Sequence, residues 1–270
     1  MLSRIVSGVI LASAIVAILL LTPWWGLGIV VLWAVFQCTR EFQSMARPDA
    51  PAWDKVAFTL AGYAVVAWPV IARYWPHYQP GLAFLIGFVL LATARLLRPL
   101  PIETAMQRLS LDALGLLYLG VTMPFIFLLR DRPGGGQVVI LAMGVTFLSD
   151  TGGYVFGRLF GKHKLYPVVS PKKTVEGVMG GVLFATGTAF LARVLFPDLG
   201  HLTALDCIVL GVVGSAFAVT GDLVESLMKR AFGVKDSGTL IPGHGGLLDR
   251  IDALLFCGPF VWVYLELLGR

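Results

Sequence analysis

The chain has 270 residues, of which 57% are hydrophobic and only 14% are charged, and its mean hydropathy is +0.82. This composition excludes an ordinary soluble globular domain as the main architecture. Three cysteines, Cys38, Cys207 and Cys257, lie in apolar stretches without metal-ligand spacing, so we expect them to pack as small hydrophobic side chains.

The length is best divided into membrane spans, because about 20 apolar helical residues cross a hydrocarbon core about 30 Å thick. A lone segment in lipid must satisfy its backbone hydrogen bonds internally, so each span is expected to be helical. The sequence therefore predicts an all-α, polytopic integral membrane protein with about nine transmembrane helices. The expected spans are 5–22, 24–39, 56–72, 81–97, 112–130, 137–157, 177–197, 203–226 and 251–268. The second is short, and Asp150, Gly152 and Gly153 interrupt the sixth.

The first apolar stretch has two interpretations. It carries one arginine, an apolar core and small residues, as a signal peptide does. We prefer a retained helix, because the apolar core is long and further spans follow without a soluble domain. We also expect a division into N-terminal membrane helices, residues 1–135, and a C-terminal catalytic half, residues 136–270.

The distribution of basic residues predicts the orientation of these spans. If the N-terminus is cytoplasmic, 16 of the 21 lysines and arginines fall in cytoplasmic segments. Positive residues favour the cytoplasmic side, so the pattern indicates an N-terminus inside and a C-terminus outside. Two polar segments, 157–177 and 221–252, are then cytoplasmic.

Small residues recur four apart on two neighbouring spans. "GVMGG" (177–181) and "GVVGS" (211–215) allow close contact between helices. We favour helix packing for these glycines over a ligand-binding role.

In the segment 157–177, Ser170-Pro171 resembles a helix start, with serine as N-cap and proline at the first helical position. Lys172 and Lys173 would then lie at the positive end of the helix dipole, which is favourable only if an anion binds there. The alternative is a basic patch that attracts anionic lipids.

In "GDLVESLMKR" (221–230), Asp222, Ser226 and Lys229 fall within about 60° of one another on a helix. A carboxylate in a membrane helix is a functional candidate by default. The simpler alternative is that Asp222 only pairs with Lys229.

Across the following loop, Asp249 and Asp252 are three residues apart, and hence on one face of a helix. Asp222 and Asp249 lie on opposite sides of the loop and could converge on one point. Carboxylates without a cluster of Cys or His suit a hard cation such as Mg²⁺. For His244, which lies between glycines, loop structure and ligand contact are equally good interpretations.

Together the two segments describe a site for polyanions and a divalent cation at the membrane surface. The chain has no GxxxxGK[ST] motif, GxSxG elbow or HExxH pair. "SLMKRAFGVKDSGTLIPGHGGLLDRID" (226–252) closely resembles the signature of the phosphatidate cytidylyltransferases, also called CDP-diacylglycerol synthases. "SDTGGYVFGRLFGKHKL" and "SPKKTVEG" are similar to the second signature region of that family, except that Gly153 stands where alanine is expected.

The resemblance implies transfer of CMP from CTP to phosphatidate at a multi-pass inner (plasma) membrane, with the active site facing the cytoplasm. It also implies Mg²⁺, and a monovalent cation such as K⁺, with Asp222 and Asp249 as the metal ligands. CTP, phosphatidate and membrane lipid are the expected partners; a homodimer is left open, and no nucleic-acid partner is expected. Phosphate contacts are assigned to Lys172, Lys173, Ser226, Lys229, Arg230 and Lys235. The catalytic set comprises Asp222, Lys229, Arg230, Lys235, Asp236, His244, Asp249, Arg250 and Asp252.

Other functions remain as alternatives. The nearest is another CTP-dependent membrane lipid enzyme, either an isoprenoid alcohol kinase or an archaeal-type lipid cytidylyltransferase. A transporter would place charges near the bilayer midplane on broken helices of related halves. Here the charges gather at the cytoplasmic ends of the later spans, and no internal repeat is visible.

Overall fold

The computed structural model describes residues 13–240 and 245–269. The expected first span lies partly outside these residues, and residues 13–21 are helical. Five of the described helical segments are long and apolar enough to cross a membrane, which agrees with an all-α integral membrane protein. These five are Pro80–Leu97, Ile102–Arg130, Gly135–Phe160, Val175–Leu195 and Ala204–Ala231.

The chain forms two compact units. The first contains residues up to Gly26, Leu129–Ala231 and Ile251–Arg270, and the second contains Leu27–Leu128 and Phe232–Arg250. Among the described residues, three helices contribute residues to both units, namely α2, α7 and α11. The expected division into N-terminal membrane helices, residues 1–135, and a C-terminal catalytic half, residues 136–270, remains a prediction.

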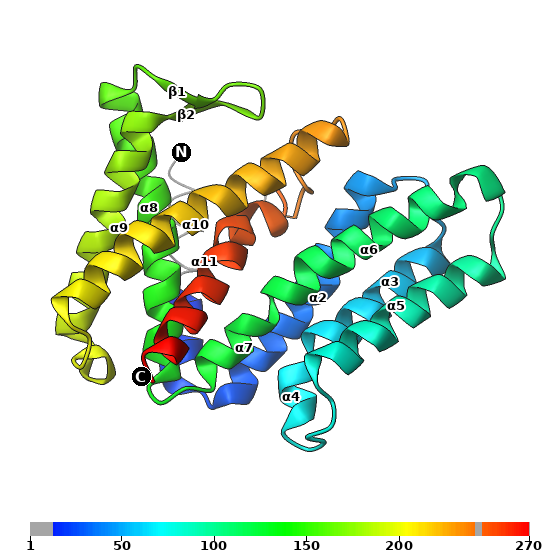
Figure 1. Ribbon diagram of the computed structural model, residues 1–270, viewed down its shortest axis with the longest axis horizontal. Helices are drawn as coiled ribbons and strands as arrows, with labels where there is room; N and C mark the ends of the chain where they lie inside the picture. The colour runs from blue at the N-terminus through cyan, green and yellow to red at the C-terminus, as the bar shows by residue number, and fades with distance from the viewer. Residues whose placement is uncertain (1–12, 241–244, 270) are drawn as a thin grey trace. The chain divides into compact units, whose positions relative to one another are not determined.

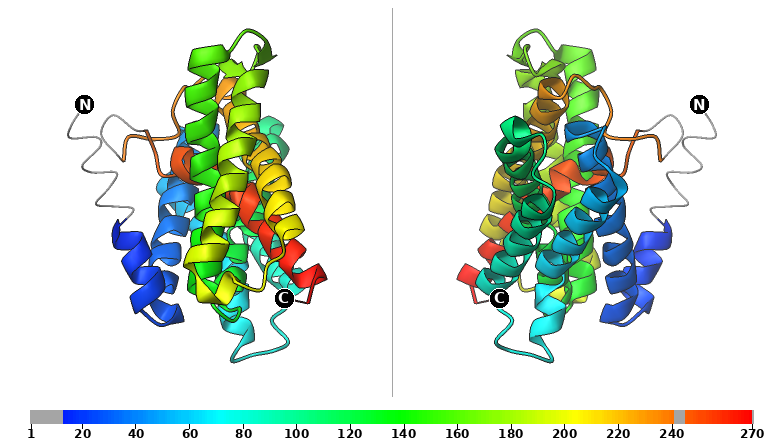
Figure 2. Two further views of the ribbon diagram at one scale, coloured as in Figure 1. Left: turned by 90° about the vertical axis from the view of Figure 1, so that its left-hand side faces the viewer. Right: turned by 90° about the vertical axis from the view of Figure 1, so that its right-hand side faces the viewer.

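The first unit is built on long helices and one β-hairpin (Figure 1). Its helices are α8 (Gly135–Phe160), α9 (Val175–Leu195), η2 (Pro197–Leu199), α10 (Ala204–Ala231) and the greater part of α11 (Leu248–Leu267). Its strands are β1 (Lys164–Tyr166) and β2 (Ser170–Thr174), which pair antiparallel. Figure 2 shows α8 and α9 side by side, with the hairpin at one end of the pair.

Glycines allow the helices of the first unit to touch through their backbones. A Cβ at Gly152 of α8 would lie 2.5 Å from the carbonyl oxygen of Gly180 on α9, and a Cβ at Gly180 would lie 2.8 Å from that of Gly152. On α10, a Cβ at Gly211 would lie 2.3 Å from the Cα of Thr186. The close packing expected for "GVMGG" and "GVVGS" is therefore confirmed.

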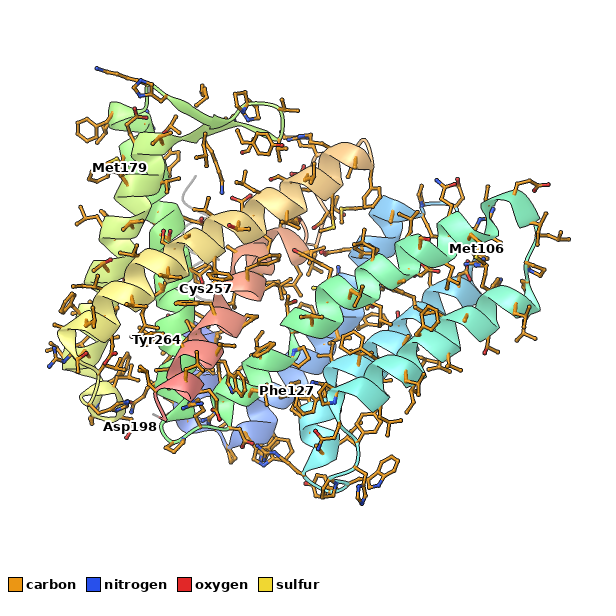
Figure 3. All side chains as sticks on the ribbon, viewed as in Figure 1. Met106, Phe127, Met179, Asp198, Cys257 and Tyr264 are labelled. Carbon is orange, nitrogen blue, oxygen red and sulfur yellow. The ribbon has the colours of Figure 1, made fainter. Side chains whose placement is uncertain are left out.

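Polar contacts join the same helices where side chains are buried. The hydroxyls of Ser149 on α8 and Ser215 on α10 are 2.7 Å apart. Near the start of α10, Asp206 accepts a hydrogen bond over 2.9 Å from the hydroxyl of Tyr264 on α11, and Tyr264 is labelled in Figure 3. Such pairing satisfies polar groups that would otherwise be costly to bury.

The second unit contains the remaining helices. They are α2 (Trp24–Ala46), α3 (Ala52–Val66), α4 (Trp68–Ala72), α5 (Pro80–Leu97), η1 (Ile102–Thr104), α6 (Ala105–Thr122) and α7 (Pro124–Arg130). The expected span 56–72 is divided after Val66, because Pro69 cannot donate a backbone hydrogen bond to the preceding turn. The second span is longer than expected, since α2 has 23 residues.

A buried ionic cluster holds four helices of the second unit together. Arg47 at the end of α2 pairs with Asp54 of α3, and with Asp112 of α6 at 2.5 Å. Arg95 of α5 lies 3.0 Å from Asp54 and 3.5 Å from Asp112. All four residues are at most 8% exposed. Their alternating charges offset the cost of burial, which isolated charges could not do.

Candidate active site

The hairpin replaces the helix start that the sequence predicted at Ser170-Pro171, and that prediction was wrong. Residues 170–174 are extended and pair with residues 164–166. Helix α9 begins at Val175, and the Thr174 hydroxyl accepts a hydrogen bond from the N–H of Gly177 over 3.1 Å. Threonine can cap the helix as serine does. Lys172 and Lys173 therefore lie on a strand and not in the first helical turn.

Glu176, in the first turn of α9, fixes the base of the hairpin. Its carboxylate accepts hydrogen bonds from the N–H groups of Lys162 and His163, and lies 2.6 Å from the His163 ring nitrogen Nδ1. The hairpin is thereby tied to α9 at both of its ends, because Thr174 leads directly into the helix. This attachment fixes the orientation of β2, the strand that contains Lys172 and Lys173.

A pocket of about 250 Å³ lies in the first unit where β2 meets α8, α9 and α10. Its wall includes Asp150, Lys172, Lys173 and Asp222. Sites for whole small-molecule ligands usually have about 300–1,000 Å³, so this pocket is smaller than such sites.

Asp222 connects the two polar segments. Its Oδ2 lies 2.6 Å from the ammonium of Lys173, and its Oδ1 accepts a hydrogen bond from the Ser226 hydroxyl over 3.2 Å. The side chains of Lys173 and Asp222 are 21% and 27% exposed. The expected stripe of Asp222 and Ser226 on one helix face is confirmed by their contact.

Lys229 does not pair with Asp222, so the simpler alternative for Asp222 is wrong. Lys229 instead forms an ion pair with Glu225, one turn earlier on α10. Glu225 is fully buried and Lys229 is 9% exposed. A residue four positions away is the nearer neighbour on a helix, which leaves Asp222 to the lysine of the hairpin.

Asp252 of α11 and Asp150 of α8 belong to the same region of the first unit. A Cβ at Gly221, the residue before Asp222, would lie 2.5 Å from the backbone oxygen of Asp252, and the Asp252 carboxylate is buried and accepts a hydrogen bond from the N–H of Ala253. Within residues 13–240 and 245–269, no three acidic, His or Cys side chains are close enough to hold a metal ion together.

The rest of the predicted set lies in segment 232–250 of the second unit. The Asp249 Oδ2 accepts three hydrogen bonds of 2.8 Å, from the N–H and hydroxyl of Ser237 and from the N–H of Gly246. Lys235, Asp236 and Arg250 are exposed, as is Arg230 at the end of α10. His244 lies outside the described residues. Asp222 belongs to the first unit and Asp249 to the second, and a metal ion shared by them remains a prediction.

The structure adds residues that sequence reasoning left without a role. Asp150 lines the pocket, and the signal that could have identified it is a carboxylate inside an apolar span. Glu225 is the buried partner of Lys229, at the helical spacing of an ion pair. Glu41 of α2 contacts the loop before Asp249, and no local pattern indicates this contact, which joins residues about 200 positions apart.

The arrangement is suited to binding anionic groups at the end of a helix bundle. Lys172 and Lys173 face a pocket that also contains carboxylate oxygens. Lysine ammonium groups bind phosphate as point charges, and carboxylates attract either those ammonium groups or hard cations.

Comparison with known proteins agrees with this chemistry. The profile of the Cytidylyltransferase family matches residues 2–268. Phosphatidate cytidylyltransferase of Staphylococcus epidermidis is 44% identical over 148 residues, and those of Staphylococcus saprophyticus and Staphylococcus aureus are 45% identical over 148 and 150 residues. Each match covers 55% of this chain and 55% of the relative, so the chain spans about half the length of the curated relatives it matches. Because the family profile extends over nearly the whole sequence, the chain belongs to the Cytidylyltransferase family.

Proposed function

We propose that the protein transfers the CMP group of CTP to phosphatidate, giving CDP-diacylglycerol and pyrophosphate for phospholipid biosynthesis. The observation that carries the proposal is the pocket of the first unit, where Lys173 of the polar segment 157–177 pairs with Asp222 of the polar segment 221–252. The names of the Staphylococcus relatives support the same activity.

The reaction needs little acid–base help from the protein. A phosphate monoester has a second pKa of about 6, so the phosphate of phosphatidate is largely ionised at neutral pH. One of its oxygens forms a bond to the α-phosphorus of CTP, and the bond from that phosphorus to the oxygen that bridges the α- and β-phosphates breaks, so that this oxygen leaves with pyrophosphate. The main task is to bring two polyanions together in line, which requires positive charge more than a base.

The basic residues of the two segments supply that charge. We assign phosphate contacts to Lys172 and Lys173 on β2, to Lys229 and Arg230 on α10, and to Lys235, with Ser226 as a neutral donor. Asp236, His244, Arg250 and Asp252 shape the site around the phosphates. Lys173 holds Asp222 in the absence of substrate and would turn to an incoming phosphate oxygen.

Asp222 and Asp249 are the proposed ligands of Mg²⁺. Their donor chemistry fits, because both offer carboxylate oxygens, the ligands that Mg²⁺ prefers. Asp222 already attracts a cation, since the Lys173 ammonium lies 2.6 Å from its Oδ2. A bound Mg²⁺ would neutralise charge on the phosphates and on the leaving pyrophosphate. A monovalent cation such as K⁺ is included in the proposal on the family resemblance.

We further propose that the protein is a multi-pass protein of the inner (plasma) membrane with about nine spans. The bias of basic residues supports a cytoplasmic N-terminus, an external C-terminus and a site that faces the cytoplasm, where CTP is found. A homodimer is compatible with this arrangement and can be tested by the mass of the purified protein in detergent.

One experiment tests the function directly. Purified protein is incubated with phosphatidate, Mg²⁺ and CTP labelled in either the α- or the γ-phosphate, and the lipids are then separated. We expect label from the α-phosphate to enter a lipid that comigrates with CDP-diacylglycerol. Label from the γ-phosphate in a lipid would indicate a kinase, and the same assay with an isoprenoid alcohol or an archaeal-type lipid would identify its substrate. No lipid label with phosphatidate would overturn the proposal.

A further inference from the structure

A carboxylate of the second unit, Glu41 on α2, lies at the centre of a hydrogen-bond network. It is 4% exposed. Its Oε1 accepts hydrogen bonds from the amide of Gln37 over 2.7 Å and from the N–H of Leu247 over 2.9 Å. Its Oε2 accepts from the N–H of Leu248 over 2.8 Å and from the hydroxyl of Ser237 over 3.2 Å. Two of these four donors, Ser237 and Leu247, precede α11, and a third, Leu248, is its first residue.

The position of Glu41 is that of a cap on α11. This helix begins at Leu248, and the first N–H groups of a helix have no acceptor within the helix itself. A negative charge is also favoured at this end by the helix dipole. Glu41 provides both the acceptor oxygens and the charge from a helix about 200 residues earlier in the chain.

Glu41 and Asp249 are connected through Ser237. The Ser237 hydroxyl lies 2.8 Å from the Asp249 Oδ2 and 3.2 Å from the Glu41 Oε2. It also accepts a hydrogen bond from the N–H of Asp249 over 3.3 Å. The hydroxyl has one proton, which both carboxylates can accept, so a shift of either carboxylate changes the hydrogen bond to the other. Ser237 therefore links the positions of Glu41 and Asp249.

The glycines of the signature loop are required by the same two carboxylates. A Cβ at Gly246 would lie 2.5 Å from the Glu41 Oε2 and 2.2 Å from the Ser237 hydroxyl. Gly245 has φ +81°, and a Cβ there would lie 2.5 Å from the Asp249 Oδ2. The loop therefore approaches Glu41 and Asp249 more closely than any other residue type would allow.

We propose that Glu41 is a positioning residue for Asp249: it fixes the signature loop and the first turn of α11, and so holds the Asp249 carboxylate in the orientation that the metal requires. The proposal rests on the proposed function, in which Asp249 is a metal ligand. A glutamine at position 41 would turn an NH₂ group toward one of the backbone N–H donors, so the negative charge and both acceptor oxygens are needed. Groups that orient metal ligands typically change metal affinity or activity by about 10–100-fold when they are removed.

The first test is independent of catalysis. Hydrogen exchange is measured for a peptide that covers residues 245–255 in the wild type, Glu41→Ala and Glu41→Gln. We expect exchange at the affected amides in this peptide to be roughly tenfold faster or more, because Leu247 and Leu248 both lose their acceptor in Glu41→Ala and one of them loses it in Glu41→Gln. The matched control is Asp206→Ala, which removes another carboxylate that is 4% exposed and that accepts hydrogen bonds from Thr203 and Tyr264 at the start of α10.

The second test measures the affinity for a divalent cation by titration with Mn²⁺, followed by electron paramagnetic resonance, and the Mg²⁺ concentration that gives half-maximal turnover. Folded Glu41→Gln should bind Mn²⁺ about 10–100-fold more weakly, and the Mg²⁺ midpoint should rise by a similar factor. Asp206→Ala should lower the yield of folded protein without changing either value.

The outcomes separate this proposal from the proposed function. Unchanged loop exchange, or faster exchange with unchanged Mn²⁺ affinity, would overturn the role of Glu41 even if the enzyme is active. If the wild type transfers no CMP to phosphatidate, the proposed function fails, and loop exchange and Mn²⁺ affinity still decide whether Glu41 positions Asp249. A Glu41→Gln variant that matches Asp206→Ala in every measurement would show that Glu41 contributes only to folding.

Discussion

Replacing Asp222 by Asn tests whether this carboxylate takes part in the reaction or only balances the charge of Lys173. The change keeps the size of the side chain and an oxygen that can accept the Ser226 hydroxyl, which now lies 3.2 Å from Oδ1. It removes the negative charge that faces the Lys173 ammonium at 2.6 Å. Both side chains retain contact with solvent, at 21% and 27% exposure. The stability lost should therefore be only about 1–2 kcal/mol.

The expected loss of activity is much larger than this change in stability. If Asp222 stabilises charge in the transition state through a bound metal ion, its neutralisation should cost about 3–4 kcal/mol, a factor of roughly 100–1,000 in rate. The two effects are separated by measuring Mg²⁺-dependent formation of CDP-diacylglycerol per folded molecule, with the folded fraction taken from size-exclusion chromatography in detergent. Adding Asp249→Asn should lower the rate little further, because residues that act as a unit are not additive.

The matched control is Asp198→Asn, which makes the same change on η2, at the end of α9 remote from the hairpin (Figure 3). This variant should retain normal turnover, because Asp198 is exposed and lies outside the pocket. Near-normal turnover of folded Asp222→Asn would refute the role of Asp222. Equal losses in Asp222→Asn and Asp198→Asn would show that the assay reports a general effect of lost charge.

Three further predictions concern the contact between α8 and α9, the cap of α9 and the orientation of the protein in the membrane. Gly180→Ala should lower the free energy of unfolding by about 1–3 kcal/mol, because its Cβ would lie 2.4 Å from that of Phe156. In the control Gly187→Ala, on the same helix, the new Cβ meets nothing within 4 Å, so this variant should not be destabilised. Equal thermal midpoints of the two variants in detergent would contradict the close α8–α9 contact. Thr174→Val should cost about 0.5–2 kcal/mol through loss of the cap on Gly177, whereas Thr174→Ser should retain it; a stable Thr174→Val in the same thermal assay would show that the cap is dispensable. Val168→Cys should react with an impermeant thiol reagent from the cytoplasmic side, because Val168 is 83% exposed while Cys38, Cys207 and Cys257 are buried. Labelling only from the opposite side would reverse the proposed orientation.

The features that the sequence predicted correctly are those that depend on neighbouring residues. Hydrophobic length predicted the five described helical segments that are long and apolar enough to cross a membrane, since every backbone polar group in lipid must be satisfied within its own segment. Helical periodicity placed Asp222 beside Ser226, because residues four apart always meet on a helix. Spacing of small residues likewise predicted the contact of α9 with its neighbours. The signature resemblance indicated the family without any knowledge of the fold.

Local patterns were misleading where two structures compete for one segment. Ser170-Pro171 satisfies the rule for a helix start, yet pairing with residues 164–166 keeps this stretch extended, and Thr174 caps the helix instead. The spacing of Asp222 and Lys229 along α10 likewise suggested an ion pair between them. Glu225 is the nearer partner of Lys229, and Lys173 reaches Asp222 from the hairpin.

Only the tertiary structure could identify the partners that are distant in the chain. Glu41 contacts Leu248 across 207 positions, and Arg47 contacts Asp112 across 65, and the neighbouring sequence indicates neither partner. Which charges share a buried cluster depends on how helices pack, and packing is determined by contacts that no local periodicity encodes. The sequence by itself thus determined the all-α membrane architecture and the family. The fold decided which carboxylate meets which lysine, and which residue of the N-terminal half supports the signature loop, because burying a charge is favourable only where its partner is already in place.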